Sequence, residues 1–225
     1  MTRAMYPSLA TDEETAPPMA TTRSARLVRA YIGLGANVGD AAATLTAGVH
    51  AMAALPGAHL RGVSRLYATA PWGVKDQPEF RNAVVALDVP AGPSPAIGAS
   101  ALLVALKSIE RAFGRQEREH WGPRELDLDL LVFGRARISI ERPPAGRSLD
   151  AAKVDVPLIV PHPEARNRLF VLAPLSDLAP GLAPPDWGER VSTARKRQLA
   201  AEGSDWVRAI ARWERATGRW VPSQP

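Results

Sequence analysis

The sequence has no cysteine among its 225 residues. This absence excludes disulfide bonds and metal sites built from thiolates, and it is consistent with a cytoplasmic protein. No run of about 18 apolar residues occurs, so we expect neither a membrane-spanning helix nor a membrane partner. Lysine is scarce as well, at positions 75, 107, 153 and 196 only. Arginine therefore supplies nearly all of the positive charge behind the formal net charge of +5.

An arginine-rich composition is typical of proteins that bind nucleic acids or nucleotides, because the planar guanidinium group makes bidentate contacts with phosphate. A GC-rich coding bias accounts for scattered arginines equally well. With 46% hydrophobic and 23% charged residues, the chain is expected to be globular rather than disordered. Its length suffices for one good core or a core with appendages.

The chain divides into three parts. We expect residues 1–26 to be a flexible N-terminal extension rather than a signal peptide, because they contain charges and prolines without an apolar block. Residues 27–185 carry alternating strand and helix signals and form the expected domain, with a Pro/Gly/Arg-rich loop insertion at 142–156. Residues 186–225 are a Trp- and Arg-rich C-terminal extension.

The C-terminal extension is expected to be helical. Trp206, Ile210 and Trp213 fall at i, i+4 and i+7, which is the spacing of one helix face. We therefore predict an amphipathic helix that docks its tryptophan side on the domain or on a second subunit; a frayed tail is the alternative.

Within the domain, the pattern predicts an α+β fold. Expected strands cover 27–33, 60–69, 82–89 and 126–133, expected helices cover 41–55 and 95–113, and a hairpin through Gly134 leads to a last strand at 138–140. The order β-α-β-β-α-β is that of the ferredoxin-like split βαβ unit, with an antiparallel sheet and flanking helices. Helices on one face would leave the other face free for a site, so this fold does not by itself name a function.

The sharpest functional signal is the segment WGPRELDLDL, residues 121–130. Asp127 and Asp129 are two residues apart on an expected strand, so both side chains leave the same face. Neighbouring carboxylates repel unless a cation lies between them, and oxygen ligands without histidine or cysteine suit Mg²⁺. Taken alone, an ordinary solvent face explains the pair equally well. Arg124, three residues upstream, favours phosphate chemistry.

A charged loop precedes this segment. Residues 114–120 read GRQEREH and include Arg115 and Arg118. A basic loop beside a magnesium site can close over a triphosphate and exclude water. A solvated run of charges is the alternative.

Two further segments carry aromatic residues. In 69–82, Trp72 and Phe80 are followed by Asn82, a combination that can stack on a flat heterocycle and read its edge. A plain core role for Phe80 is the alternative. In 160–170, prolines hold His162 extended, and Arg168 and Phe170 follow. A lone histidine is more often structural, but these neighbours again indicate a charged nucleotide and an aromatic ligand.

These four segments, in this order, resemble the 6-hydroxymethyl-7,8-dihydropterin pyrophosphokinases, over roughly residues 28–182. The resemblance implies that ATP, as co-substrate, donates its β,γ-pyrophosphoryl group to the hydroxymethyl oxygen of 6-hydroxymethyl-7,8-dihydropterin. Two Mg²⁺ ions assist, AMP is released, and the reaction belongs to tetrahydrofolate biosynthesis. A monomer or a homodimer with no nucleic-acid partner is the corresponding expectation.

The resemblance also implies residue roles. Asp127 and Asp129 hold the metal and, with Arg115 and Arg124, are the catalytic residues. The pterin contacts are Thr69, Pro71, Trp72, Phe80, Asn82, Trp121 and Phe170. The ATP contacts are Glu110, Arg115, Arg118, Arg124, His162 and Arg168. The loop departs from the family pattern at Glu117 and His120, where arginines are usual, which affects the expected rate and affinity rather than the reaction.

Three other readings are weaker. The turn GLGANVG at 33–39 is one residue too long for the dinucleotide-binding pattern G-x-G-x-x-G. An RNA-binding module of the same topology needs aromatic residues on the open sheet face, where Asp127 and Asp129 are expected instead. A catalytically inactive regulatory domain is opposed by the intact aspartate pair.

Overall fold

The computed structural model describes residues 26–70, 76–114, 124–147, 156–203 and 206–222. Its main sheet is antiparallel, with the strand order β5-β1-β4-β3-β8-β9 and with β2 also paired to β4. These strands are β1 (Leu27–Ala36), β2 (His59–Val63), β3 (Leu66–Thr69), β4 (Phe80–Pro90), β5 (Asp127–Phe133), β8 (Val207–Glu214) and β9 (Arg219–Pro222). A second, two-stranded sheet joins β6 (Ile138–Ile140) to β7 (Leu158–Val160).

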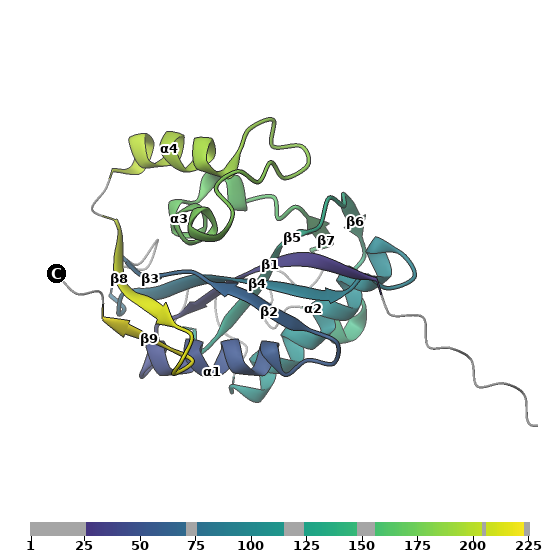
Figure 1. The fold of residues 1–225 in the computed structure, drawn as a ribbon, viewed down its shortest axis with the longest axis horizontal. Coiled ribbons are helices and arrows are strands. Elements are labelled where there is room, and N and C mark those ends of the chain that lie inside the picture. The colour runs from purple at the N-terminus through teal and green to yellow at the C-terminus, as the bar shows by residue number, and fades with distance from the viewer. Residues whose placement is uncertain (1–25, 71–75, 115–123, 148–155, 204–205, 223–225) are drawn as a thin grey trace, which may run out of the picture.

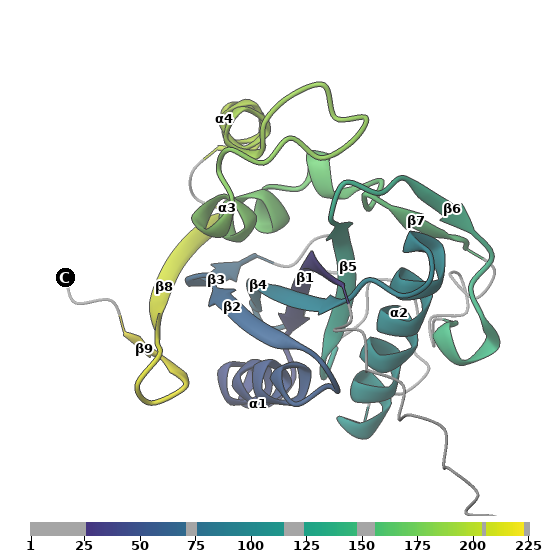
Figure 2. The same ribbon diagram turned by 45° about the vertical axis from the view of Figure 1, so that its right-hand side comes forward.

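Helices cover both faces of the main sheet (Figures 1 and 2). On one face lie α1 (Ala41–Ala53) and α2 (Pro95–Ala112), and on the other lie α3 (Leu169–Leu178) and α4 (Val191–Glu202). Each pair packs on its own buried apolar cluster. The expectation of one free sheet face is therefore wrong in part, because α3 and α4 bury some of it. None of the described helices is long and apolar enough to cross a membrane.

The predicted order β-α-β-β-α-β is confirmed from β1 to β5, except that the second predicted strand is divided into β2 and β3. Asp40 caps the start of α1, because its carboxylate accepts a hydrogen bond from the Ala43 amide at 3.0 Å. On α2, Leu102, Leu106 and Ile109 are buried, as their helical spacing predicts. Local signals and tertiary packing thus agree for both helices.

The strand expected over 60–69 is two strands, β2 and β3, which both pair with β4. The break falls at Ser64, whose side chain accepts a hydrogen bond from the Val84 amide at 2.9 Å. The next amide, that of Arg65, is bound by the Asp177 carboxylate on α3 at 3.1 Å. The Ser64 amide still donates to the Val84 carbonyl at 2.9 Å, so side chains replace only part of the backbone pairing where the chain changes direction.

The hairpin expected between 126–133 and 138–140 is also wrong. β6 pairs with β7 rather than with β5. The chain makes a tight turn at Gly134, where φ is +56°, and the Gly134 amide bonds the Arg29 carbonyl of β1 at 2.7 Å. The outer edge of β5 is instead bonded by side chains of α2 and by the backbone of His162.

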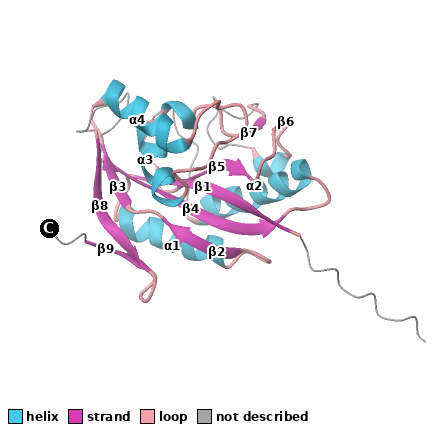
Figure 3. Ribbon diagram, turned by 45° about the horizontal axis from the view of Figure 1, so that its top comes forward, coloured by secondary structure: helices cyan, strands magenta, loops and turns pink. Residues whose placement is uncertain are grey.

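The predicted C-terminal helix through Trp206, Ile210 and Trp213 is wrong as well, because this stretch forms β8 (Figure 3). β8 pairs with the edge of β3, and a turn ending at Gly218 leads into β9. The rings of Trp213 and Trp220 lie edge to face with their centroids 4.8 Å apart. An unpaired edge of β3 competes successfully with helical spacing, because pairing satisfies the backbone groups of both strands. A helix does occur in the extension, but earlier, as α4.

Candidate active site

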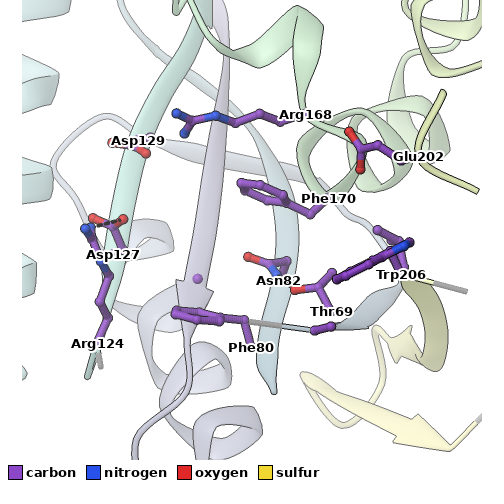
Figure 4. A pocket seen from close by; sticks show the side chains of 13 residues that line it. Thr69, Phe80, Asn82, Arg124, Asp127, Asp129, Arg168, Phe170, Glu202 and Trp206 are labelled. Carbon is purple, nitrogen blue, oxygen red and sulfur yellow. Dashed lines mark hydrogen bonds and ion pairs between the residues drawn. The ribbon is translucent and has the colours of Figure 1, made fainter. Parts of the chain in front are cut away.

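A pocket of about 180 Å³ opens where β5, β1, β4 and β3 meet the start of α3 and the C-terminal segment (Figure 4). Its lining residues are Gly35, Thr69, Ala70, Phe80, Asn82, Arg124, Asp127, Asp129, Arg168, Phe170, Glu202, Trp206 and Val207. Asp127, Asp129 and Arg124 lie at one end, and the rings of Phe80, Phe170 and Trp206 follow toward the other end, where Glu202 also lies (Figure 4). The pocket is therefore polarised along its length.

The predicted aspartate pair lies at the polar end. Asp127 and Asp129 both line the pocket, while Leu126 and Leu128, before and between them, are fully buried, as alternation along β5 predicts. The Arg124 guanidinium donates a hydrogen bond to the Asp127 carboxylate at 2.6 Å. This contact offsets part of the charge that two neighbouring carboxylates place on one sheet face.

Asn37 holds the segment before β5 in place. Its side-chain oxygen accepts a hydrogen bond from the Arg124 backbone amide at 2.7 Å, and its backbone amide donates to the Arg124 carbonyl at 3.0 Å. Its Nδ2 donates to Gln77 and to the Pro78 carbonyl at 3.1 and 3.2 Å. One buried amide at the end of β1 thus joins the segments that lead into β5 and β4. The turn at residues 33–39 is recognisable in the sequence, whereas the hydrogen bonds by which Asn37 joins the two segments are not.

Glu110 lies beneath the strand that carries the aspartates. Its Oε1 accepts from the Leu128 amide at 2.6 Å and from Lys107 Nζ at 2.7 Å. Lys107 also donates to the Leu128 carbonyl at 3.0 Å, and both side chains are buried. The peptide groups of Leu128 lie between Asp127 and Asp129. Glu110 was expected among the ATP contacts, and the structure places it instead where it fixes the backbone of the aspartate strand.

The aromatic end is formed by Phe80 at the start of β4 and Phe170 in the first turn of α3, on either side of Asn82 (Figure 4). The Asn82 amide nitrogen donates to the Thr69 hydroxyl at 2.6 Å, and both residues are buried. A side chain at Gly35 would place its Cβ 3.1 Å from Asn82 Oδ1. Glycine at this position therefore keeps the pocket open in front of the amide oxygen.

Arg168 and His162 differ in where they lie. Arg168 lines the pocket, and its guanidinium carbon is 5.9 Å from the centroid of the Phe170 ring. His162 instead lines a neighbouring hollow with Arg137, Ser139 and other residues, and its Nδ1 accepts from the Glu164 amide at 3.3 Å. The structure thus does not bring His162 into the pocket that contains the aspartates.

Five predicted site residues, Pro71, Trp72, Arg115, Arg118 and Trp121, lie outside the described residues, as do Glu117 and His120. Their roles stay predictions.

Sequence reasoning did not identify four residues near the site. Glu202, Trp206 and Val207 line the pocket from the C-terminal extension, where Glu202 ends α4 and the pairing of β8 with β3 brings in Trp206 and Val207. Arg142 is the fourth. Burial lowers its pKa, while the charges of Asp129 and Glu110 act in the opposite direction, and its Nε has no hydrogen-bond partner among the described residues.

The donor set fits a magnesium ion. Among the described residues, no group of three or more histidine, cysteine, aspartate or glutamate side chains is placed to hold a metal. A pair of carboxylates beside an open pocket nevertheless suits Mg²⁺, which takes its other ligands from water and substrate phosphates. Asp127 and Asp129 are the residues that would hold it.

The fold and the pocket define an α+β protein with a cavity in which aromatic rings lie beside a pair of carboxylates. Comparison with known protein families assigns the chain to one of them. The chain belongs to the 7,8-dihydro-6-hydroxymethylpterin-pyrophosphokinase (HPPK) family, whose model matches residues 31–180.

Curated relatives agree with this assignment. Two similar proteins are named 2-amino-4-hydroxy-6-hydroxymethyldihydropteridine pyrophosphokinase. The one from Methylorubrum extorquens is 41% identical over 156 residues, which covers 69% of this chain and 85% of the relative. The one from Pseudomonas aeruginosa is 40% identical over 158 residues, which covers 70% and 85% respectively.

Solved structures support the fold. Wild-type HPPK-DHPS of Plasmodium falciparum, crystallised with STZ-DHP, aligns with a TM-score of 0.65 at 14% identity over 89% of this chain. An HPPK-DHPS in complex with substrates aligns with a TM-score of 0.62 at 13% identity over 88%. The chain spans about half the length of these structures, 49% in both cases. At such identities the likeness concerns the fold alone.

Proposed function

We propose that this chain transfers the β,γ-pyrophosphoryl group of ATP to the hydroxymethyl oxygen of 6-hydroxymethyl-7,8-dihydropterin. The products are the pterin diphosphate and AMP, and the reaction belongs to tetrahydrofolate biosynthesis. The observation that carries this proposal is a pocket in which Asp127 and Asp129 lie at one end and Phe80 and Phe170 at the other. Family membership favours the same reaction.

The aromatic end suits the pterin. A flat ring between Phe80 and Phe170 buries both faces, and aromatic pairs add stabilisation beyond the area buried. Because Asn82 Nδ2 is bonded to Thr69, its Oδ1 faces the pocket beside Gly35, where it can accept a hydrogen bond from an edge N–H of the ring. We infer that this end orients the hydroxymethyl group toward the aspartates.

The polar end suits the triphosphate. Asp127 and Asp129 are proposed to hold two magnesium ions, which supply charge stabilisation for the transferring group when bound. The Arg124 guanidinium already lies against Asp127, so metal binding requires it to share or release this carboxylate and frees it for phosphate oxygens. Arg168 adds a positive charge between this end and Phe170 (Figure 4).

Positioning carries most of the catalysis in this account. Phosphoryl transfer needs alignment and charge neutralisation rather than a covalent intermediate. Glu110 and Lys107 contribute indirectly, because they fix the Leu128 peptide that separates the two aspartates. A cytoplasmic location and a monomeric or homodimeric state are part of the same proposal.

The proposal is tested by incubating the protein with ATP, Mg²⁺ and the reduced hydroxymethyl-pterin and separating the nucleotides. We expect AMP and the pterin diphosphate in equal amounts, and no AMP when the pterin is omitted or when EDTA is added. Release of ADP in place of AMP would contradict pyrophosphoryl transfer.

A further inference from the structure

Trp206 closes the aromatic end of the pocket. It lies beyond Thr69 and Asn82, on the side away from the aspartates (Figure 4). The residue is 46% exposed, which is unusual for so large an apolar residue. The family model ends at residue 180, so this wall comes from chain outside the matched part.

The backbone of Trp206 is held against the pocket by strand pairing. β8 begins at the next residue, Val207, which pairs with Thr69 of β3. The Trp206 carbonyl also accepts a hydrogen bond from the Ala70 amide at 3.4 Å. The indole is therefore attached directly beside the residue that bonds Asn82.

Side chains tie the same segment to both aromatic walls. On the Phe80 side, Arg208 donates to Glu79 at 2.8 Å, a contact that lowers the pKa of Glu79. On the Phe170 side, the Glu202 carboxylate at the end of α4 accepts from the Leu169 amide at 3.4 Å. Exposed ion pairs contribute little individually. Together, the strand pairing and the Arg208–Glu79 contact nevertheless hold the backbone at Trp206 beside the pocket.

We propose that Trp206 contacts the pterin and shields its outer end from water, so that the affinity for this substrate depends on the C-terminal segment. The inference rests on the proposed function, because it takes the flat ring to lie between Phe80 and Phe170. A ring held there with its edge at Asn82 has its outer end toward the indole. Bound substrate would then cover apolar surface that the free protein exposes.

The test is steady-state kinetics of Trp206→Ala and Trp206→Phe, with each substrate varied while the other is saturating. For Trp206→Ala we expect the KM for the pterin to rise about tenfold, the scale of a lost aromatic contact. The KM for ATP and kcat should stay within about twofold, since the wall is distant from the triphosphate end. Trp206→Phe should recover most of the loss. Arg212→Ala, on the exposed side of β8, is the matched control and should behave as wild type.

Binding is measured independently by tryptophan fluorescence as the pterin is added without ATP. The signal change should be smaller in Trp206→Phe than in the wild type, whether or not turnover is affected. If Trp206→Ala lowers the melting temperature, Trp206→Leu replaces it, because leucine keeps an apolar side chain at this position.

The outcomes separate the two proposals. An active wild type with an unchanged pterin KM in Trp206→Ala would overturn the wall inference and leave the proposed function standing. A parallel rise in both KM values, or a loss of kcat alone, would also overturn it, since either indicates a structural role. A wild type that releases no AMP would instead refute the proposed function.

Discussion

Asp127 and Asp129 present two negative charges to one pocket, and their effect on turnover should exceed their effect on folding. Replacing either with asparagine removes charge without changing shape. We expect kcat to fall at least about 100-fold, because losing a metal ligand costs several kcal/mol of transition-state stabilisation. Pterin binding without ATP and the melting temperature should change little. Glu141→Gln, at an exposed position beyond β6, is the control.

Near-normal AMP production by both aspartate variants would rule out the metal assignment. Loss of activity together with a collapse of the melting temperature would assign the pair a structural role instead.

Glu110 offers a choice between two roles. As a support for Leu128, its replacement by glutamine should lower the melting temperature and kcat while leaving the KM for ATP unchanged. If Glu110 contacts ATP directly, the same replacement should raise the KM for ATP and leave the melting temperature unchanged.

Lys107→Met should destabilise the fold by about 3 kcal/mol in urea titration, because removing one partner of a buried ion pair leaves the other charge uncompensated. A cost below about 1 kcal/mol would show that the pair is not needed to hold the strand.

At the residue scale, the sequence predicted the aspartates well and their surroundings poorly. A period of two along a strand is a local property, so Asp127 and Asp129 are recognisable without tertiary information. The burial of Glu110 depends on how α2 packs against β5. The positions of Arg142 and Trp206 likewise depend on segments distant in sequence.

Among the elements, β4 is joined to its neighbours by Asp88. The carboxylate accepts hydrogen bonds from Arg29 of β1 and from Arg61 of β2, the latter at 2.6 Å. The bond from Arg29, aided by that from Arg61, lowers the pKa of Asp88 below its ordinary value of 3.8. A carboxylate with a lowered pKa stabilises the fold above its ordinary pKa, and this contribution is lost as the pH falls through the lowered value.

Asp88→Asn should therefore flatten part of the loss of melting temperature below about pH 4, while lowering the melting temperature slightly at neutral pH. The effect should be small, since both arginines are partly exposed to water. An acid profile identical to that of the wild type would show that other carboxylates determine it.

The C-terminal hairpin gives the second prediction for the elements. Truncation after Gly188 removes α4, β8 and β9 and uncovers the edge of β3 together with the apolar surface that packs on Val191 and Trp220. We expect a melting temperature lower by at least about 10 °C, and self-association through the freed edge. Truncation after Pro222 is the control. An unchanged melting temperature and subunit number in the first variant would refute docking of the extension.

The wrong helix prediction for this hairpin has a physical explanation. Spacing at i and i+4 is an even number of residues, so it is compatible with one face of a strand as well as with one face of a helix. Local periodicity therefore left both structures open. The choice was made by the unpaired edge of β3, which the sequence of the extension does not contain. Elements such as α1 and α2 were predicted correctly because the signals that determine them lie within their own sequences.

At the scale of the whole molecule, the family match and the folded sheet do not end together. The match stops at residue 180, yet the main sheet continues through β8 and β9 to Pro222. The extension therefore completes one edge of the sheet (Figure 3), and Trp206 from the same segment lines the pocket (Figure 4). The pairing of β8 with β3 thus gives the C-terminal segment two roles. It covers the edge of β3, and it places Trp206 in the lining of the pocket.

The central claim is that one pocket aligns a pterin with the β-phosphorus of ATP. It is tested most directly by following labelled phosphorus through a single turnover with the reduced hydroxymethyl-pterin and Mg²⁺. The account predicts that label from the γ position of ATP appears wholly in the pterin diphosphate, and that label from the α position stays wholly in AMP. Label from the γ position in a pterin monophosphate, or in free phosphate formed without the pterin product, would contradict it.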